Sequence, residues 1–324
     1  MDDCIVMSFF MQGDGMVRDL WPRLMGRPIR EQAEENTFAD WELVPESFSG
    51  VCEWAQVILA EEDNSLGMQH RLVYKHRDGK ELFEVCVRAQ GFVKCQSIGP
   101  LGNWNGSVAH CPKALQTLEL EGNKLPGVFK LQHQAVENLR SYILATLRSK
   151  PTDTRASDDT VLRFSKRVFT KVDARNRNSV RSVLNIGDDP EGRAAKVQMD
   201  WVVAHTVNYG NEGPTGEQDS CSHLTVQVGD FVDVAFAFEI LTFFKKGKKL
   251  TEINLAARDV LRLRSAADFQ HMCLAPEMQP LLKAPSIRIA QTASGLHMSK
   301  RKREDEGVEQ GKKKIRQGSS RMEE

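Results

Sequence analysis

A run of basic residues between positions 163 and 181 has the composition of a phosphate-binding surface. It contains seven Lys and Arg residues against the single acid Asp173, with Phe164 and Phe169 interleaved among them. Cations that neutralise phosphates release condensed counterions, and exposed aromatic rings stack on bases. The run therefore predicts a nucleic-acid-binding segment in which Phe164 and Phe169 are the stacking residues. Its basic members are Arg163, Lys166, Arg167, Lys171, Arg175, Arg177 and Arg181.

The same pattern also fits a strand whose Phe side chains enter the core beneath a solvated charged face, which is a common arrangement. A second basic group surrounds Gly247 and could extend the same surface. Basic residues at a hairpin tip are equally ordinary as solubilising residues. The members of this second group are Lys245, Lys246, Lys248 and Lys249.

Two further basic clusters lie near the C-terminus and are separated by eight residues. A flexible segment can place two such clusters in the acidic grooves of an import carrier. The pair therefore predicts nuclear import and a nuclear protein; the alternative is a solvating tail that binds polyanions weakly. The clusters consist of Lys300, Arg301, Lys302 and Arg303, and of Lys312, Lys313 and Lys314.

Neither metal ligation nor catalysis has a convincing pattern. Cys221-x-His223 and His271-x-Cys273 have one intervening residue each, whereas structural zinc pairs have two to four. The seven cysteines contain no Cys-x-x-Cys pair, and their odd number favours reduced thiols. His205 lies on an otherwise apolar strand face, where a core histidine is the simpler interpretation than a general base. We therefore assign no catalytic residue, metal or cofactor.

These residues must be positioned by a chain of 324 residues, of which 40% are hydrophobic, enough for a globular core. The 44 basic and 44 acidic residues cancel, so only local clusters of charge are informative. The apolar-rich stretch 224–244 contains Asp230, Asp233 and Glu239, which argue against a membrane span. The acidic start Met1-Asp2-Asp3 lacks the basic region of a secretory signal, so we expect no export.

The first 150 residues are expected to form an α+β region that ends in an amphipathic helix. Apolar residues recur every four positions from Leu131 to Leu147, between Pro126-Gly127 and Lys150-Pro151. Two strands are expected on either side of Asp78-Gly79, a dipeptide typical of tight hairpin turns. The polar stretch 151–160 is the expected linker.

Residues 161–298 are expected to form a mainly antiparallel β-domain, either a sandwich or an OB-like barrel. Alternating apolar residues predict one strand over 197–209 and a hairpin whose strands cover 232–240 and 251–257. Residues 299–324 hold nine basic and six acidic residues and little that could be buried, so this tail should be disordered.

The second half of the chain resembles uncharacterised proteins of mushroom-forming fungi. The resemblance rests on Val228-Gly229-Asp230-Phe231-Val232-Asp233-Val234, the basic Gly turn, the Leu-containing return strand and the basic tail. It implies no activity and no functional residue.

The sequence predicts a nuclear, non-enzymatic protein whose β-domain binds DNA or RNA through its basic segments. One alternative is a protein-interaction scaffold or dimerisation module that uses the same strands. The other is an enzyme with an inter-domain site.

Overall fold

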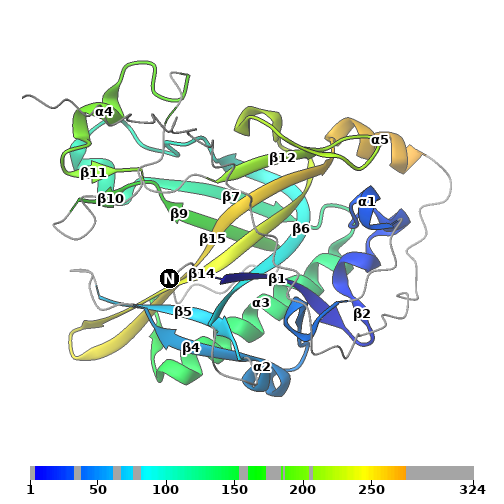
Figure 1. Cartoon of the computed structure of the whole chain (residues 1–324), viewed down its shortest axis with the longest axis horizontal. Coiled ribbons are helices and arrows are strands. Elements are labelled where there is room, and N and C mark those ends of the chain that lie inside the picture. The colour runs from blue at the N-terminus through cyan, green and yellow to red at the C-terminus, as the bar shows by residue number, and fades with distance from the viewer. Residues whose placement is uncertain are drawn as a thin grey trace, which may run out of the picture.

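The computed structural model describes residues 4–32, 38–60, 67–75, 82–152, 160–172, 184, 187–203 and 207–274. Within them, thirteen strands form one large mixed sheet in which antiparallel pairings predominate, and two short strands pair separately. Few helices accompany the sheet (Figure 1). The expected α+β class with a mainly antiparallel sheet is therefore confirmed.

The strands are β1 Cys4–Gln12, β2 Gly15–Met16, β3 Leu43–Val44, β4 Ala55–Leu59, β5 Met68–Tyr74, β6 Phe83–Ser97, β7 Leu115–Glu121, β8 Lys150–Pro151, β9 Val161–Arg167, β10 Thr170–Lys171, β11 Trp201–Val202, β12 Asn208–Glu212, β13 Gln218–Ser220, β14 Phe231–Lys245 and β15 Lys248–Arg264. The α-helices are α1 Ile29–Gln32, α2 Phe48–Trp54, α3 Pro126–Leu147, α4 Arg193–Val197 and α5 Ala266–Leu274.

Five of these strands enclose the main core as a small barrel. β7 pairs with β6 and β9, and β14 pairs with β6 and β15. β9 lies against β15, where Ser165 Oγ donates to Asn254 Oδ1 at 3.4 Å. Inside, the rings of Phe164 and Phe236 have centroids 5.2 Å apart. A five-stranded, partly open barrel of this kind is the OB-like architecture.

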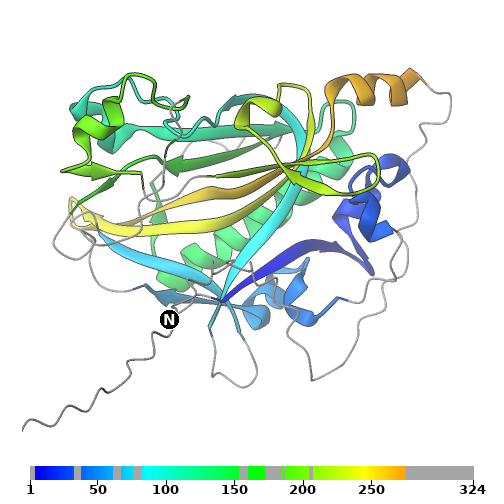
Figure 2. The same ribbon diagram turned by 45° about the horizontal axis from the view of Figure 1, so that its top comes forward.

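Helix α3 packs against one face of the sheet (Figures 1 and 2), as its four-residue apolar repeat predicts. Val136, Leu139 and Ile143 are fully buried in the same core as the barrel strands. Gln132 also ties the helix to β6, because its Oε1 accepts from Gln90 N and its Nε2 donates to Gln90 O. The helix thereby satisfies both backbone polar groups of this buried strand residue.

No helix of the described residues is long and apolar enough to cross a membrane.

Both expected hairpins are present as strand pairs. β5 and β6 pair at Val73–Glu84 and Tyr74–Phe83, while part of the intervening turn, including Asp78-Gly79, lies outside the described residues. β14 and β15 pair along their whole length, with Lys246 and Gly247 at positive φ (51° and 73°) in the turn. Positive φ at both central residues is the geometry of a tight hairpin turn that follows the strand twist.

The expected boundary at 151–160 does not separate two independent units. β14 and β15, from the second half of the chain, are built into the same sheet as β5 and β6, from the first half. β6 is long enough to pair with β14 along one edge while also pairing with β1, β5 and β7. The stretch 151–160, which is polar and has few apolar residues, therefore connects strands of one sheet.

The single strand expected over 197–209 is wrong. Val197 ends α4, β11 covers only two residues, and β12 begins at Asn208. Val197 and Val203 are buried with Phe169 in a small separate core, while Met199 is 80% exposed. The alternating apolar residues thus belong to several short elements instead of one strand. His205 lies outside the described residues.

Candidate nucleic-acid interface

The basic side chains predicted on β9 do not form one free cationic surface. Arg163 is exposed, but its Nη2 lies 2.6 Å from Glu119 Oε1 on the neighbouring strand β7. Arg167 is also exposed, and its Nη1 donates to Pro112 O at 2.9 Å. Lys171 is exposed on β10, whereas Arg175, Arg177 and Arg181 lie outside the described residues.

Lys166 is half-buried and belongs to a charged cluster at the side of the barrel. Burial lowers the pKa of its amine, although the nearby Glu239 acts in the opposite direction. Burial raises the pKa of Glu239, and Lys166 and Arg167 oppose that shift. Arg258 in the same cluster is paired with Glu84, Nη2 to Oε2 at 2.6 Å. Lys166 therefore has anionic neighbours of its own and is a weaker phosphate contact than its sequence position indicates.

The stacking role predicted for Phe164 and Phe169 is wrong, because both rings are buried. Phe164 is 1% exposed inside the barrel, and Phe169 is 3% exposed in the small core beside Trp104, at a centroid distance of 4.8 Å. Neither ring offers a face to a base. Strand alternation sends Phe164 inward beneath the charged residues, as the simpler interpretation of this run predicts.

The lysines around Gly247 lie in a different setting, at the free end of the β14–β15 hairpin. Lys245, Lys246 and Lys248 are exposed. Lys249 Nζ donates to Leu147 O, the last residue of α3, at 2.8 Å. A cation at a helix C-terminus stabilises the unsatisfied carbonyls there.

That contact brings two more cations to the same place. Arg148 is exposed just after α3, with a left-handed backbone (φ 47°), and Lys150 pairs in parallel with Leu250 through β8. Figure 1 shows the hairpin projecting from the barrel. We name this group of six cations, together with Phe244, the hairpin end. Its members are Arg148, Lys150, Phe244, Lys245, Lys246, Lys248 and Lys249.

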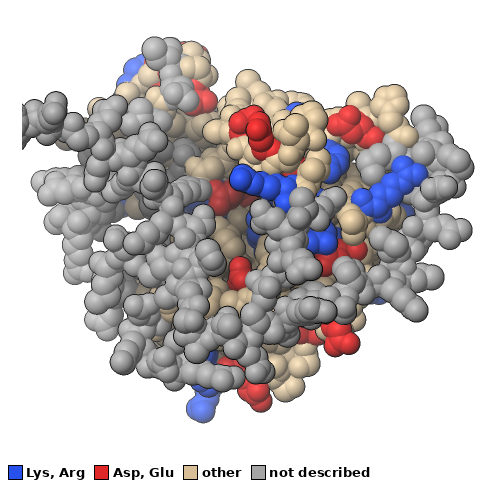
Figure 3. Space-filling view, turned by 45° about the vertical axis from the view of Figure 1, so that its right-hand side comes forward, with Lys and Arg blue, Asp and Glu red and all other residues tan. Residues whose placement is uncertain are grey.

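The charge of the hairpin end is not neutralised within the part of the chain that the structure describes: none of its six cations forms an ion pair there. The arginines of β6 and β15 differ, since each has a carboxylate partner. On the face shown in Figure 3, basic and acidic side chains likewise lie next to one another. The pairs are Arg88–Asp233 (2.7 Å), Arg258–Glu84 (2.6 Å), Arg264–Glu212 (2.8 Å) and Arg262–Asp230 (3.8 Å).

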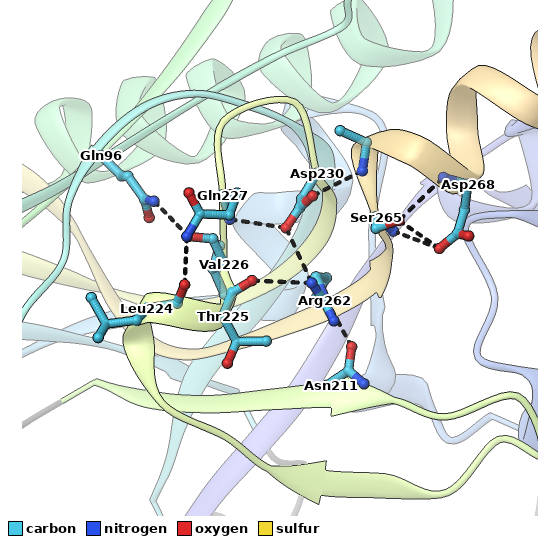
Figure 4. Close-up of polar contacts among 11 residues, drawn as sticks. Gln96, Asn211, Leu224, Thr225, Val226, Gln227, Asp230, Arg262, Ser265 and Asp268 are labelled. Carbon is cyan, nitrogen blue, oxygen red and sulfur yellow. Dashed lines mark hydrogen bonds and ion pairs between the residues drawn. The ribbon is translucent and has the colours of Figure 1, made fainter.

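The Asp230–Arg262 pair illustrates the structural use of such residues (Figure 4). Asp230 Oδ2 accepts from Gln227 N at 2.9 Å, and its Oδ1 accepts from Ala266 N at the start of α5. Arg262 donates to Thr225 O and to Asn211 Oδ1. The network fixes the turn before β14 to the end of β15, so these charges hold the fold together.

The structure does not bring the candidate metal ligands into a cluster. Among the described residues, no group of three or more His, Cys, Asp or Glu side chains could hold a metal ion. His223 lies 4.0 Å from Asp188 and packs edge-on to Tyr209, and Cys221 is a half-buried free thiol. The side chain of Cys273 is not among those described.

Sequence reasoning missed Phe244, Arg148 and Lys150. A signal for Phe244 was present, because Phe243 and Phe244 are adjacent at the end of an alternating strand. Two neighbouring strand residues point to opposite faces, so both rings cannot enter one core. The two cations follow a helix by only a few residues, and their proximity to the turn at Gly247 depends on the tertiary fold.

The architecture defines the class: an α+β protein built around an OB-like barrel that carries a basic hairpin. No family model matches the chain, and no curated protein does. Among solved structures, the single-stranded DNA-binding protein from bacteriophage Enc34 in complex with ssDNA is similar at 13% identity and a TM-score of 0.25. That match covers 65% of this chain and 96% of that chain. The same phage protein without DNA matches at 13% identity and a TM-score of 0.24, over 65% and 90% of the two chains. Similarity at this level assigns no function.

Proposed function

We propose that this is a nuclear nucleic-acid-binding protein whose main contact surface is the hairpin end. In OB barrels, oligonucleotides bind across the second and third strands and the connections between strands one and two and strands four and five. The corresponding elements here are β7, β9, the connection from β6 to β7 and the β14–β15 turn. The exposed side of β9 with Arg163 and Arg167 would extend the surface.

The observation that carries the proposal is the contrast between the two groups of cations. The arginines of β6 and β15, and Arg163 of β9, are held by carboxylates, whereas the six cations of the hairpin end have no such partner among the described residues. Like charges gathered in one place repel one another, and a polyanion relieves that repulsion.

The first test uses the whole chain with the seven cations of its two basic tail clusters replaced by glutamine, so that these clusters do not bind the probe. We call this the tail-neutral protein; the changes are K300Q, R301Q, K302Q, R303Q, K312Q, K313Q and K314Q. Fluorescence anisotropy with a labelled oligothymidylate should show saturable binding that weakens with salt. For three to six phosphate contacts, the slope of log K against log salt should be about −2 to −4. The absence of binding to single-stranded and duplex DNA and RNA would contradict the proposal. Salt-insensitive self-association instead would favour the interaction scaffold.

Nuclear import is tested separately with a fluorescent reporter fused to residues 295–324. We expect the reporter to accumulate in the nucleus, because two basic clusters with a short spacer fit the grooves of an import carrier. The control is the same fusion with the seven cations replaced by glutamine, which should distribute through the whole cell. Equal distribution of both fusions would contradict the nuclear assignment.

A further inference from the structure

Phe244 is an exposed aromatic ring in the middle of the hairpin end. It is 68% exposed, next to Lys245 in sequence and directly opposite Lys249 in the β14–β15 register. Strand alternation places its neighbour Phe243 on the opposite face of the hairpin, where it is half-buried. Phe244 therefore has Lys245 beside it along the strand and Lys249 across the hairpin, and it contributes little to the core.

The hairpin that carries this ring is anchored before any ligand arrives. Thr251 Oγ1 lies 2.9 Å from Thr242 Oγ1 across the hairpin, and 2.6 Å from Ser149 Oγ in the segment after α3. Lys249 adds its bond to Leu147 O. Because the base of the hairpin is fixed to the end of α3, little order has to be gained when a ligand binds to its tip.

The positive charge of the hairpin end determines which kind of ligand can bind there. A second copy of the protein would bring six more cations to the same place, and like-charge juxtaposition disfavours such a dimer. An unpaired nucleotide instead offers a phosphate for the lysines and a flat base for the ring. In a duplex the bases are already stacked and paired, so their faces cannot reach Phe244.

We propose that the hairpin end selects single-stranded over duplex nucleic acid by stacking an unpaired base on Phe244, while Arg148 and Lys150 contact the adjacent phosphates. This inference rests on the proposed function and adds to it the class of ligand and the residue that distinguishes it. Phe244 is a specificity-determining residue with no predicted role in stability.

The test measures the binding of three labelled probes by the tail-neutral protein: an oligothymidylate, a duplex of equal length, and an abasic phosphodiester of equal length. In the F244A variant, affinity for oligothymidylate should fall about 5- to 150-fold, the loss of one base stack. Affinity for the duplex and for the abasic probe should change less than about twofold, since phosphate contacts remain. F244W should retain single-strand affinity. F48A, which truncates the 44% exposed Phe48 of α2, is the matched control and should leave all three affinities unchanged.

The outcomes separate this inference from the function on which it rests. If no probe binds the tail-neutral protein, the proposed function fails. If all three probes bind equally and F244A binds like the parent, nucleic-acid binding stands and base stacking on Phe244 is overturned. Sedimentation velocity tests for a dimer. If the parent protein dimerises and F244A abolishes the dimer, a second copy of the protein occupies this surface, and base stacking on Phe244 is overturned.

Discussion

Replacing Asp233 by alanine is expected to lower the free energy of unfolding by about 3–5 kcal/mol, the usual cost of removing one partner from a buried ion pair. Asp233 is 1% exposed. The apolar residues at alternate positions of β14 would instead predict a strand with one face in solvent and Asp233 on that face. Its Oδ1 accepts from Arg88 Nε at 2.7 Å, and its Oδ2 accepts from Gln90 Nε2 at 2.6 Å. Alanine would leave the Arg88 guanidinium and the buried Gln90 amide without this shared acceptor.

Urea unfolding followed by circular dichroism measures the effect, with D219A as the matched control. Asp219 is an exposed carboxylate on the edge strand β13, and its removal should change the free energy of unfolding by less than about 0.5 kcal/mol. D233N keeps one carbonyl acceptor and should fall between the two. If D233A and D219A unfold at the same urea concentration, the carboxylate is not a structural partner of Arg88 and Gln90.

Asp233 also shows which part of the fold the sequence could reveal. The apolar residues of β14 at alternate positions predicted its buried face, and Val232, Val234 and Phe236 are indeed fully buried. The opposite face, with Asp233, Ala235 and Ala237, is buried as well, and Asp233 there contacts the Arg88 and Gln90 side chains of the neighbouring strand β6. Arg88 and Asp233 are 145 positions apart, and local periodicity contains no information about such a pair.

At the candidate site, too, local sequence patterns predicted some features, whereas features that depend on contacts between distant residues were missed. The lysines of the β14–β15 turn could be identified from a local run of charge. Whether a cation has a carboxylate partner depends on cross-strand neighbours, as for Arg163 beside Glu119. Exposure of an aromatic ring depends on the strand face it occupies: Phe164, which was predicted to stack on bases, is buried, whereas Phe244 is exposed. Composition therefore found the basic segments, and only the fold shows which of them are available to a ligand.

Charge reversal at the tip of the hairpin is expected to have the largest effect on binding. In the tail-neutral protein, the combined change K245E, K246E and K248E places three carboxylates where three exposed lysines stand. Like charges facing the phosphate backbone cost several kcal/mol, so single-strand affinity should fall roughly 100-fold or more. The slope of log K against log salt should flatten by about 2, which is roughly 0.7 for each lost phosphate contact.

A matched reversal distinguishes this local effect from a change in net charge. K75E, K124E and K130E alter three exposed lysines, one after β5 and two near the start of α3, and change the net charge of the protein by the same amount. If the hairpin end is the contact surface, this control should reduce affinity no more than about threefold, because exposed charges that do not contact the bound strand are screened by salt. Equal losses in the two triple variants would mean that the polyanion responds to overall charge, and the hairpin end would not be the binding surface. Retained affinity in the hairpin variant would shift the contact to the exposed side of β9, where R163E and R167E would then be the decisive changes.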